Sequence, residues 1–512
     1  MIRAVLNDIW FKRGVLIISL TLFLVNLTKV IREFSMVYVD PDQLLMMFGT
    51  QEFLAGRFHM PRFFGQDYGS MLESFVAMPF AGLSLELALP IATCVLWLLP
   101  YLLISNRIGR NLQSYTFLFV WLLILPVEYV FLGTMPRDFV SGIAITSLAL
   151  FFLTGNSKIQ LILFGLFCIL GWSINQNAAL FGATITVYAI FEQSADRKKR
   201  FGWIVIGYLI GLAIHAGLQW FIALHPEWIV HNSWPVGFKL DLVAKGLSEL
   251  DTHWAALTPF SYRNSWIYIL LFALILLFAR KTATRYAAGV LIILLLLSLG
   301  MPKVHDGFNS IFSSYERMFM ALPVSVFFLL VSLKWHKSVR VLPLLLVMGT
   351  TFFFVRYGEV STRVERHLSP SAGHIIPHAK MEDVQDRLDF LQELADQNNV
   401  DVILLGPSIN SLDILSQVGH LGLKNDVKIL SPGFDRKTWF LREVDKPVYS
   451  RILWMQMELS AEEISSKTVL TVTDLNIPGA GFRTNEYYFL IEGDNINPLS
   501  VYADCGFKLG NY

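Results

Sequence analysis

The residues of this 512-residue chain with the clearest chemical potential are two aspartates, Asp40 and Asp42. They open a polar segment, residues 32–83, that directly follows an apolar run long enough to span a membrane. A carboxylate at the membrane surface can accept a proton from an attacking hydroxyl group. The same Asp-x-Asp pattern can also bind a divalent cation, or cap a helix that begins there. The two residues alone leave all three roles open.

A second group of polar residues lies in the same segment and in later polar loops. It comprises Gln66, Tyr68, Glu73, Arg137, Asp138, His305, Asp306 and Arg317. A guanidinium group suits a phosphate because its charge is permanent and its donors are forked. Arginines near the ends of spans can instead anchor the protein at lipid headgroups. The remaining side chains can equally be hydrogen-bonding groups of ordinary loops and turns.

Metal-ligating patterns are weak in this sequence. The three cysteines, Cys94, Cys168 and Cys505, are scattered, so they form neither a disulfide framework nor a metal site. His374 and His378 have a helical spacing, but Pro377 breaks any helix between them. We therefore expect no resident metal, apart from the cation that the Asp-x-Asp pattern could bind.

The elements that must position these residues are membrane spans. Hydrophobic residues make up 54% of the chain and charged residues 16%, and the apolar residues fall in runs of span length. The sequence predicts an α-helical polytopic membrane protein with about eleven transmembrane helices. The first covers residues 14–31, and later ones centre near Leu96, Leu122, Ser147, Leu163, Thr184, Ile210, Leu271, Leu294, Val324 and Val347.

Basic residues set the orientation of these spans. They gather in alternate loops, at Arg3, Lys12 and Arg13, at Arg107 and Arg110, at Lys158, at residues 197–200, at Arg280, Lys281 and Arg285, and at Lys334, Lys337 and Arg340. The positive-inside rule places all of these loops in the cytoplasm together with the N-terminus. The other loops and the C-terminal tail then lie outside. The short basic clusters give no nucleic-acid footprint.

The tail differs from the rest of the chain. We expect a membrane domain over residues 1–355 and an extracytoplasmic α/β domain over residues 356–512, which carries more acidic than basic residues. An amphipathic pattern, with Val384, Leu388, Leu391 and Leu394 on one face, predicts a helix over residues 383–397. Short apolar runs bounded by turn residues predict strands at 400–405, 427–430, 469–472 and 487–491.

Short motifs in the outer loops resemble those of the C-type glycosyltransferase fold. This family of polyprenyl-phosphate-sugar-dependent membrane enzymes includes protein O-mannosyltransferases and aminoarabinose transferases. Asp42 and Gly56 are similar to the acidic residue and the glycine that flank a helix in the first outer loop, with Gln43 where the family often has Glu. Residues 65–73 look like a Gly-Gln-x-Tyr-Gly-x-x-x-Glu stretch. Arg137-Asp138, and Arg317 with Pro323, are similar to further family features, and the resemblance covers roughly residues 10–350.

The resemblance implies an inverting glycosyltransferase in a bacterial inner membrane. It would move a sugar from a polyprenyl phosphate to a cell-envelope glycan or lipid; no protein-acceptor motif is recognisable. Asp42 would be the base, with Asp40 as a lesser candidate. Arg137 and Arg317 would bind the donor phosphate. Gln66, Tyr68, Glu73, Asp138 and His305 would contact substrate, and no cofactor is implied.

Three other functions fit parts of the pattern. A transporter or flippase for a lipid-linked glycan would place charges in mid-membrane and often has repeated halves. Here the charges lie in outer loops and no halves match. A glycan polymerase or ligase usually has its large loop late in the chain, whereas here the first loop is large. A scaffold that only presents the outer domain would not need a carboxylate-rich first loop.

Overall fold

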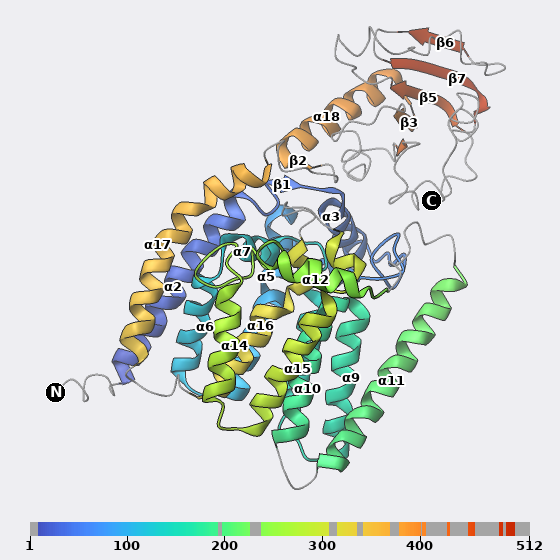
Figure 1. Ribbon diagram of the computed structural model, residues 1–512. Helices are drawn as coiled ribbons and strands as arrows, with labels where there is room; N and C mark the ends of the chain where they lie inside the picture. The colour runs from blue at the N-terminus through green and yellow to red at the C-terminus, as the bar shows by residue number, and fades with distance from the viewer. Residues whose placement is uncertain are drawn as a thin grey trace. The chain divides into compact units, whose positions relative to one another are not determined.

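The computed structural model describes residues 9–192, 197–225, 237–306, 315–334, 341–368 and 378–400, together with five strands beyond them. The chain forms two compact units (Figure 1). The first comprises Met1–Met36, Tyr68–Phe221 and Trp234–Ile375, and the second comprises Val37–Asp67, Ile222–Ser233 and Ile376–Tyr512. The chain therefore leaves the first unit after the first helix and returns to it at Tyr68.

The first unit is a helical bundle. Its longer helices are α2 (Ile9–Glu33), α5 (Leu85–Ile104), α6 (Leu112–Ile124), α9 (Lys158–Ile174), α10 (Ala179–Glu192), α11 (Arg197–Ala223), α14 (Trp266–Phe278), α15 (Thr282–Ser298), α16 (Ala321–Ser332) and α17 (Val341–Leu368). Shorter helices are α4 (Leu72–Ala77), α7 (Val127–Thr134), α8 (Ser141–Ser147), α12 (Leu240–Ser248) and α13 (Leu250–His253). Helix α2 packs along α17 and α6, and α10 packs along α15 (Figure 1). Every residue of α16 is buried, so this helix lies inside the bundle.

Apolar length supports the membrane assignment but not the predicted number of spans. Among the residues that the structure describes, four helices are long and apolar enough to cross a membrane: α2, α5 with its continuation to Gly109, α11 and α17. Helices α6 and α7 would make a fifth as a broken span, bent by 105°. The other predicted centres fall within shorter helices, so a count of about eleven is not confirmed.

Proline explains the break in the predicted span near Leu122. Leu125 precedes Pro126, and a residue before proline is disfavoured in the helical conformation. Leu125 accordingly adopts an extended backbone, with φ −72° and ψ 152°. The chain then restarts as α7 in a new direction, which places Glu128 at a helix start rather than in mid-span.

Glycines allow close packing of the helices. A methyl group at Gly165 on α9 would collide with the backbone carbonyl of Ile204 on α11. A methyl group at Gly207 on α11 would likewise meet the carbonyl of Ile162. Small residues at such crossings bring helix backbones into van der Waals contact, which is a principal source of stability between helices in lipid.

We expect Gly165→Ala to destabilise the protein by about 1–3 kcal/mol, the usual cost of an overpacked site. The obstructing atom belongs to the backbone and cannot rotate away. Gly202→Ala is the matched control, because nothing lies within 4 Å of a methyl group placed there. Thermal unfolding of the detergent-purified variants measures the difference. Equal melting temperatures for the two variants would show that the α9–α11 crossing tolerates separation.

The second unit holds most of the polar segment that follows α2, together with the tail. Strand β1 (Tyr38–Val39) pairs antiparallel with β2 (Ala379–Lys380), and helix α3 (Pro41–Leu54) follows β1. Helix α18 (Met381–Asn398) buries Val384, Leu388 and Leu391, as its sequence pattern predicts. Five strands form one sheet in the order β4-β3-β5-β7-β6, namely β3 (Val402–Leu405), β4 (Lys428–Leu430), β5 (Tyr449–Met455), β6 (Gly481–Thr484) and β7 (Tyr488–Ile496).

The strand predictions for the tail succeed in part. Strands β3, β4 and β7 lie where the apolar runs predict them, while β5 and β6 were not predicted. The predicted strand over residues 469–472 lies outside the described residues. Strand β3 pairs parallel with β4 and β5, whereas β7 pairs antiparallel with β5 and β6. A helix combined with a mixed sheet fits the expected α/β class.

Candidate functional site

Two buried carboxylates define a polar centre in the first unit. Glu73, on α4, is fully buried and accepts hydrogen bonds from the hydroxyl groups of Thr93 at 3.1 Å and Ser141 at 3.5 Å. Asp138 is 3% exposed and accepts from the backbone N–H of Ser70 at 2.9 Å and from its hydroxyl at 2.7 Å. Burial, and then the Asp138 carboxylate, raise the pKa of Glu73 well above its ordinary value. The sequence prediction grouped Glu73 and Asp138, and the structure brings them together.

The raised pKa of Glu73 makes stability depend on pH in a defined direction. The native state keeps this carboxyl protonated at pH values where the unfolded chain has ionised it, so stability falls as pH rises above about 4.5. Glu73→Gln removes that loss. Relative to the variant, we expect the wild type to lose about 1.4 kcal/mol per pH unit until the folded pKa is reached. Melting temperatures of both proteins across pH 5–9 measure the difference in stability between the wild type and Glu73→Gln. A difference that does not change with pH would show that Glu73 is ionised in the folded protein.

Arg137 and Arg317 are tied to the same part of the first unit through Asn177. The Asn177 side-chain amide donates to the backbone carbonyl of Phe139 at 2.8 Å and to that of Arg317 at 3.4 Å. Arg137 is only 5% exposed, and its guanidinium lies 5.1 Å from the centre of the Phe139 ring. Arg317 is half-buried and donates from Nη2 to the carbonyl of Asp306 at 3.3 Å. A buried Arg137 does not fit the alternative of an anchor extended toward headgroups.

Backbone geometry explains several small and polar residues of this centre. Asp138 has φ +64°, a left-handed conformation that aspartate tolerates better than most residues. The Asn175 side-chain amide donates to the carbonyl of Asp138 at 2.9 Å and holds that turn. Gly69, which precedes Ser70, has φ +75°, and Gly65, in the second unit, has φ +79°; glycine adopts such values without strain. The glycines of the 65–73 stretch therefore serve its turns.

Asp40 and Asp42 lie in the second unit and differ in environment. Asp40 is buried and caps α3, since its Oδ1 accepts from the backbone N–H of Gln43 at 2.9 Å. Gln43 closes a capping box by accepting from the backbone N–H of Asp40 at 3.1 Å. Asp42 lies in the first turn of α3 and is half-buried. Asp40 therefore has a structural task, and the catalytic role of Asp42 stays a prediction.

The remaining predicted contact residues are distributed between the two units. Gln66 is buried in the second unit, with its backbone N–H donating to the carbonyl of Phe63 at 2.9 Å. Tyr68 is half-buried and belongs to the first unit, where it begins the segment Tyr68–Phe221. His305 lies in the first unit at the end of a 3-10 turn (Pro302–His305), and its side chain is 8% exposed. The alternative of a solvated turn does not describe His305.

Sequence reasoning missed a charged cluster in the second unit. Glu52, which is 4% exposed, binds the Arg57 guanidinium through both carboxylate oxygens and contacts His59 Nε2 at 2.7 Å. Burial would raise the pKa of the Glu52 carboxyl, but Arg57 and His59 outweigh it and hold that pKa below its ordinary value. The cluster stabilises the turn at Gly56, where φ is +75°.

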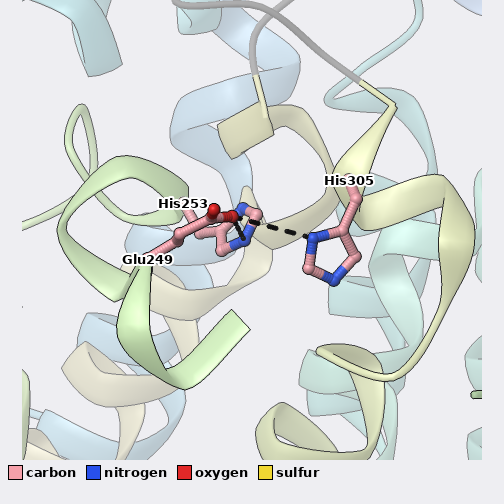
Figure 2. A group of neighbouring side chains, drawn as sticks. All are labelled: Glu249, His253 and His305. Atoms are coloured by element: carbon pink, nitrogen blue, oxygen red, sulfur yellow. Dashed lines mark ion pairs between the residues drawn. The ribbon is translucent and has the colours of Figure 1, made fainter. Parts of the chain in front are cut away.

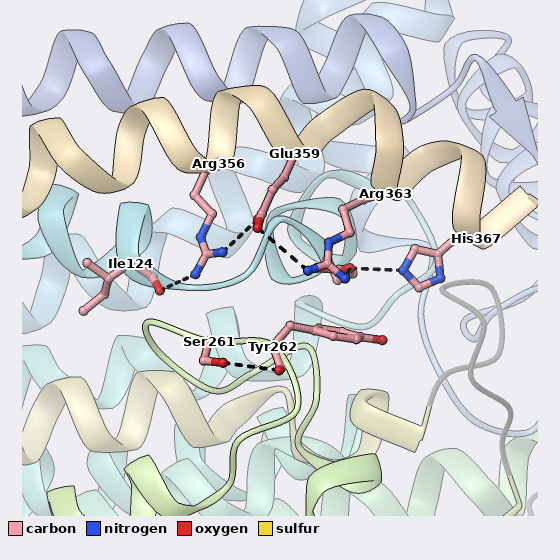
Figure 3. Close-up of polar contacts among 8 residues, drawn as sticks. Ile124, Ser261, Tyr262, Arg356, Glu359, Arg363 and His367 are labelled. Carbon is pink, nitrogen blue, oxygen red and sulfur yellow. Dashed lines mark hydrogen bonds and ion pairs between the residues drawn. The ribbon is translucent and has the colours of Figure 1, made fainter.

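A second missed cluster lies along α17. Four polar residues at helical spacing, Arg356, Glu359, Arg363 and His367, point to the same side of the helix (Figure 3). Arg356 donates to Glu359 at 2.8 Å and to the carbonyl of Ile124 at 3.0 Å. Arg363 and His367 approach the buried Glu128 carboxylate at 3.4 and 3.3 Å. These bonds join α17 to the break between α6 and α7.

Comparison with known proteins identifies the fold of the chain through a solved structure and not through its sequence. No protein-family model matches the sequence, and no curated protein sequence matches it either. Among solved structures, ArnT from Cupriavidus metallidurans in the apo state superposes with a TM-score of 0.55. The match covers 95% of this chain and 99% of that chain at 11% sequence identity. The chain has the C-type glycosyltransferase fold. The resemblance inferred from the outer-loop motifs is thereby confirmed at the level of fold.

Within this fold, the centre of the first unit combines groups suited to an anionic substrate. Arg137 and Arg317 supply permanent positive charge, and Asn177 fixes the backbone that carries them. The buried Glu73 does not add a negative charge at neutral pH if it stays protonated, as its raised pKa indicates. Such a centre can bind a phosphate and stabilise the charge that develops when that phosphate leaves.

Proposed function

We propose that this protein is an inverting glycosyltransferase that moves a sugar from a polyprenyl-phosphate donor to a cell-envelope glycan or lipid. The observation that carries the proposal is the C-type glycosyltransferase fold, matched over 95% of the chain. The aminoarabinose transferase ArnT has this fold. The buried Arg137, two residues before the Phe139 carbonyl that Asn177 binds, supports the same chemistry, because a departing lipid phosphate needs a fixed cation.

The proposed reaction is a single displacement. An acceptor hydroxyl oxygen attacks the anomeric carbon as the bond from that carbon to the phosphate oxygen breaks. The hydroxyl proton passes to a carboxylate, for which the resemblance of the loop motifs suggests Asp42. Polyprenyl phosphate departs as an anion, and the same resemblance suggests Arg137 and Arg317 as its binding residues. One attack with one base inverts the anomeric configuration and leaves no covalent sugar on the protein. None of these steps calls on a metal ion.

The proposal places the protein in a bacterial inner membrane, with its catalytic loops and C-terminal unit outside the cytoplasm. The apolar helices and the positive-inside pattern support this placement. Nucleotide sugars are cytoplasmic, so a lipid-linked sugar is the suitable activated donor on the outer face. The C-terminal unit, which has its own sheet, is suited to shaping access for the acceptor.

Mass spectrometry of envelope glycans and lipids tests the proposal in cells. We expect one glycoform, heavier by a single sugar, to disappear when the gene is deleted and to return with the wild-type protein. Complementation with Asp42→Asn should not restore it. An unchanged set of glycans and lipids after deletion, with the protein shown to be expressed in the parent strain, would contradict the proposed acceptors.

A further inference from the structure

Three potential metal ligands meet in the first unit. They are Glu249, between α12 and α13, His253, the last residue of α13, and His305 (Figure 2). One ligand atom from each residue lies within 4.8 Å of the other two. Glu249 Oε2 is 3.9 Å from His253 Nε2 and 4.0 Å from His305 Nδ1. The two imidazole rings are nearly perpendicular, at 87°, with centres 5.0 Å apart.

Local structure brings two of these ligands onto one face. Glu249 and His253 are four residues apart, and the backbone N–H of His253 donates to the carbonyl of Glu249 at 3.1 Å. One helical turn therefore aligns both side chains. His305 comes from a separate segment after α15, so a shared ion would join two outer loops that lie about fifty residues apart in the sequence.

The ring of His305 is oriented so that Nδ1 could bind a metal ion. Its Nε2 lies 2.8 Å from the backbone carbonyl of Leu299, and only a protonated nitrogen can donate there. The neutral ring then carries its lone pair on Nδ1, which faces Glu249. The Nδ1 atom is buried and has no hydrogen-bond partner among the described residues. A histidine held through its second nitrogen by a backbone carbonyl is the usual outer arrangement of a metal-binding imidazole.

The spacing of the three ligand atoms fits an ion between them better than direct pairing. Distances of 3.9 and 4.0 Å are too long for hydrogen bonds between the carboxylate and either ring. Bonds of about 2.0–2.1 Å to a tetrahedral zinc ion would separate the ligand atoms by about 3.3 Å. Contraction of these two distances by about 0.6–0.7 Å would therefore be needed. Glu249 is 43% exposed, so its side chain has room to move toward the two rings.

We propose that Glu249, His253 and His305 bind one zinc ion. Two imidazoles and one carboxylate are a common zinc-ligand set and leave one coordination position for water. This site differs from the Asp-x-Asp cation that the sequence suggested.

The ion would act as a cross-link beside Arg317. His305 is followed by Asp306, whose carbonyl accepts from Arg317 Nη2 at 3.3 Å. The backbone N–H of Ala256, three residues after His253, donates to Glu316 at 3.3 Å. Both ligand-bearing segments thus contact the residues around Arg317, and zinc would fix their positions. Zinc binding itself does not rest on the proposed transferase activity.

Metal content tests the inference directly. The full-length protein is purified in detergent without a histidine tag, and bound metals are measured by inductively coupled plasma mass spectrometry. We expect about one zinc per chain in the wild type, and a loss of at least tenfold in His305→Gln and in His253→Gln. His225→Gln, a histidine outside the cluster, is the control and should keep its zinc. Equal zinc content in wild type and both cluster variants would overturn the site.

A second measurement covers variants that fold poorly. Wild-type protein stripped by a chelator should melt at a lower temperature, regain its stability with Zn²⁺ but not with Mg²⁺, and show tetrahedral Co²⁺ absorption when loaded with cobalt. If Glu249, His253 and His305 interact only with one another, adding Zn²⁺ or Mg²⁺ will not change the melting temperature. This result would overturn the proposal. Neither experiment uses transferase activity, so the two proposals can fail independently.

Discussion

Replacing Asp42 with asparagine is expected to lower turnover by about two to four powers of ten, the usual contribution of a general base. Asparagine keeps the shape of the side chain but cannot take the proton of the acceptor hydroxyl. Asp42 lies in the first turn of α3, where its negative charge interacts favourably with the helix dipole and stabilises the helix. The loss of that charge should cost no more than about 1 kcal/mol of stability. Single-turnover transfer and melting temperature, measured on one preparation, separate the two effects.

Asp40 provides the matched control in the same loop. Asparagine is as good a helix cap as aspartate, so Asp40→Asn should keep the cap of α3 and most of the activity. Asp40→Ala should lose the bond to the Gln43 backbone and about 1 kcal/mol of stability. If Asp40→Asn is inactive while Asp42→Asn is active, the base has been assigned to the wrong aspartate. Full activity in both asparagine variants would remove the base hypothesis.

Truncation of Arg137 is the second change for which we expect a large effect. Arg137→Ala should reduce kcat by about two to three powers of ten, as the loss of one donor to a developing anion commonly does. Arg137→Lys should fall between alanine and wild type, since lysine restores the charge without the forked pair of donors. Steady-state kinetics with a polyprenyl-phosphate sugar measure both variants. The same order is expected at Arg317.

An arginine elsewhere in the same unit controls for general loss of charge. Arg107 is half-buried in the helical turn that continues α5 to Gly109, and it donates to the carbonyl of Phe151 at 2.8 Å. Arg107→Ala should change kcat less than threefold. Equal activity of Arg137→Lys and wild type would indicate an interface anchor, because either side chain can reach the headgroups. That outcome would remove Arg137 from the proposed phosphate site.

The sequence predicts the fold to the extent that local patterns determine it. Apolar runs locate the helices, since a helix in lipid must satisfy its own backbone and be apolar outside. The amphipathic face of α18 can likewise be predicted from the spacing of its apolar residues, and Val384, Leu388 and Leu391 are buried as predicted. The number of spans is harder to predict from the sequence, because Pro126 breaks one apolar run and several helices are shorter than a membrane crossing requires.

The candidate site depends on contacts that no local pattern carries. Asn177 joins the carbonyl groups of Phe139 and Arg317, which are nearly 180 residues apart, and its sequence neighbours suggest only the end of a span. Glu249 and His305 belong to unrelated loops, so the zinc ligand set emerges only in three dimensions. A signal did exist for α17, where Arg356, Glu359, Arg363 and His367 repeat at helical spacing.

Cleavage of a lipid-linked donor tests the central claim most directly. Purified protein in proteoliposomes is given polyprenyl-phosphate sugars together with an envelope lipid or glycan fraction, and released polyprenyl phosphate is measured by mass spectrometry. We expect release that depends on acceptor, a product of inverted anomeric configuration, and at least a hundredfold slower release with Asp42→Asn. Movement of intact donor across the bilayer without release of polyprenyl phosphate, or equal release by the wild type and Asp42→Asn, would contradict the account.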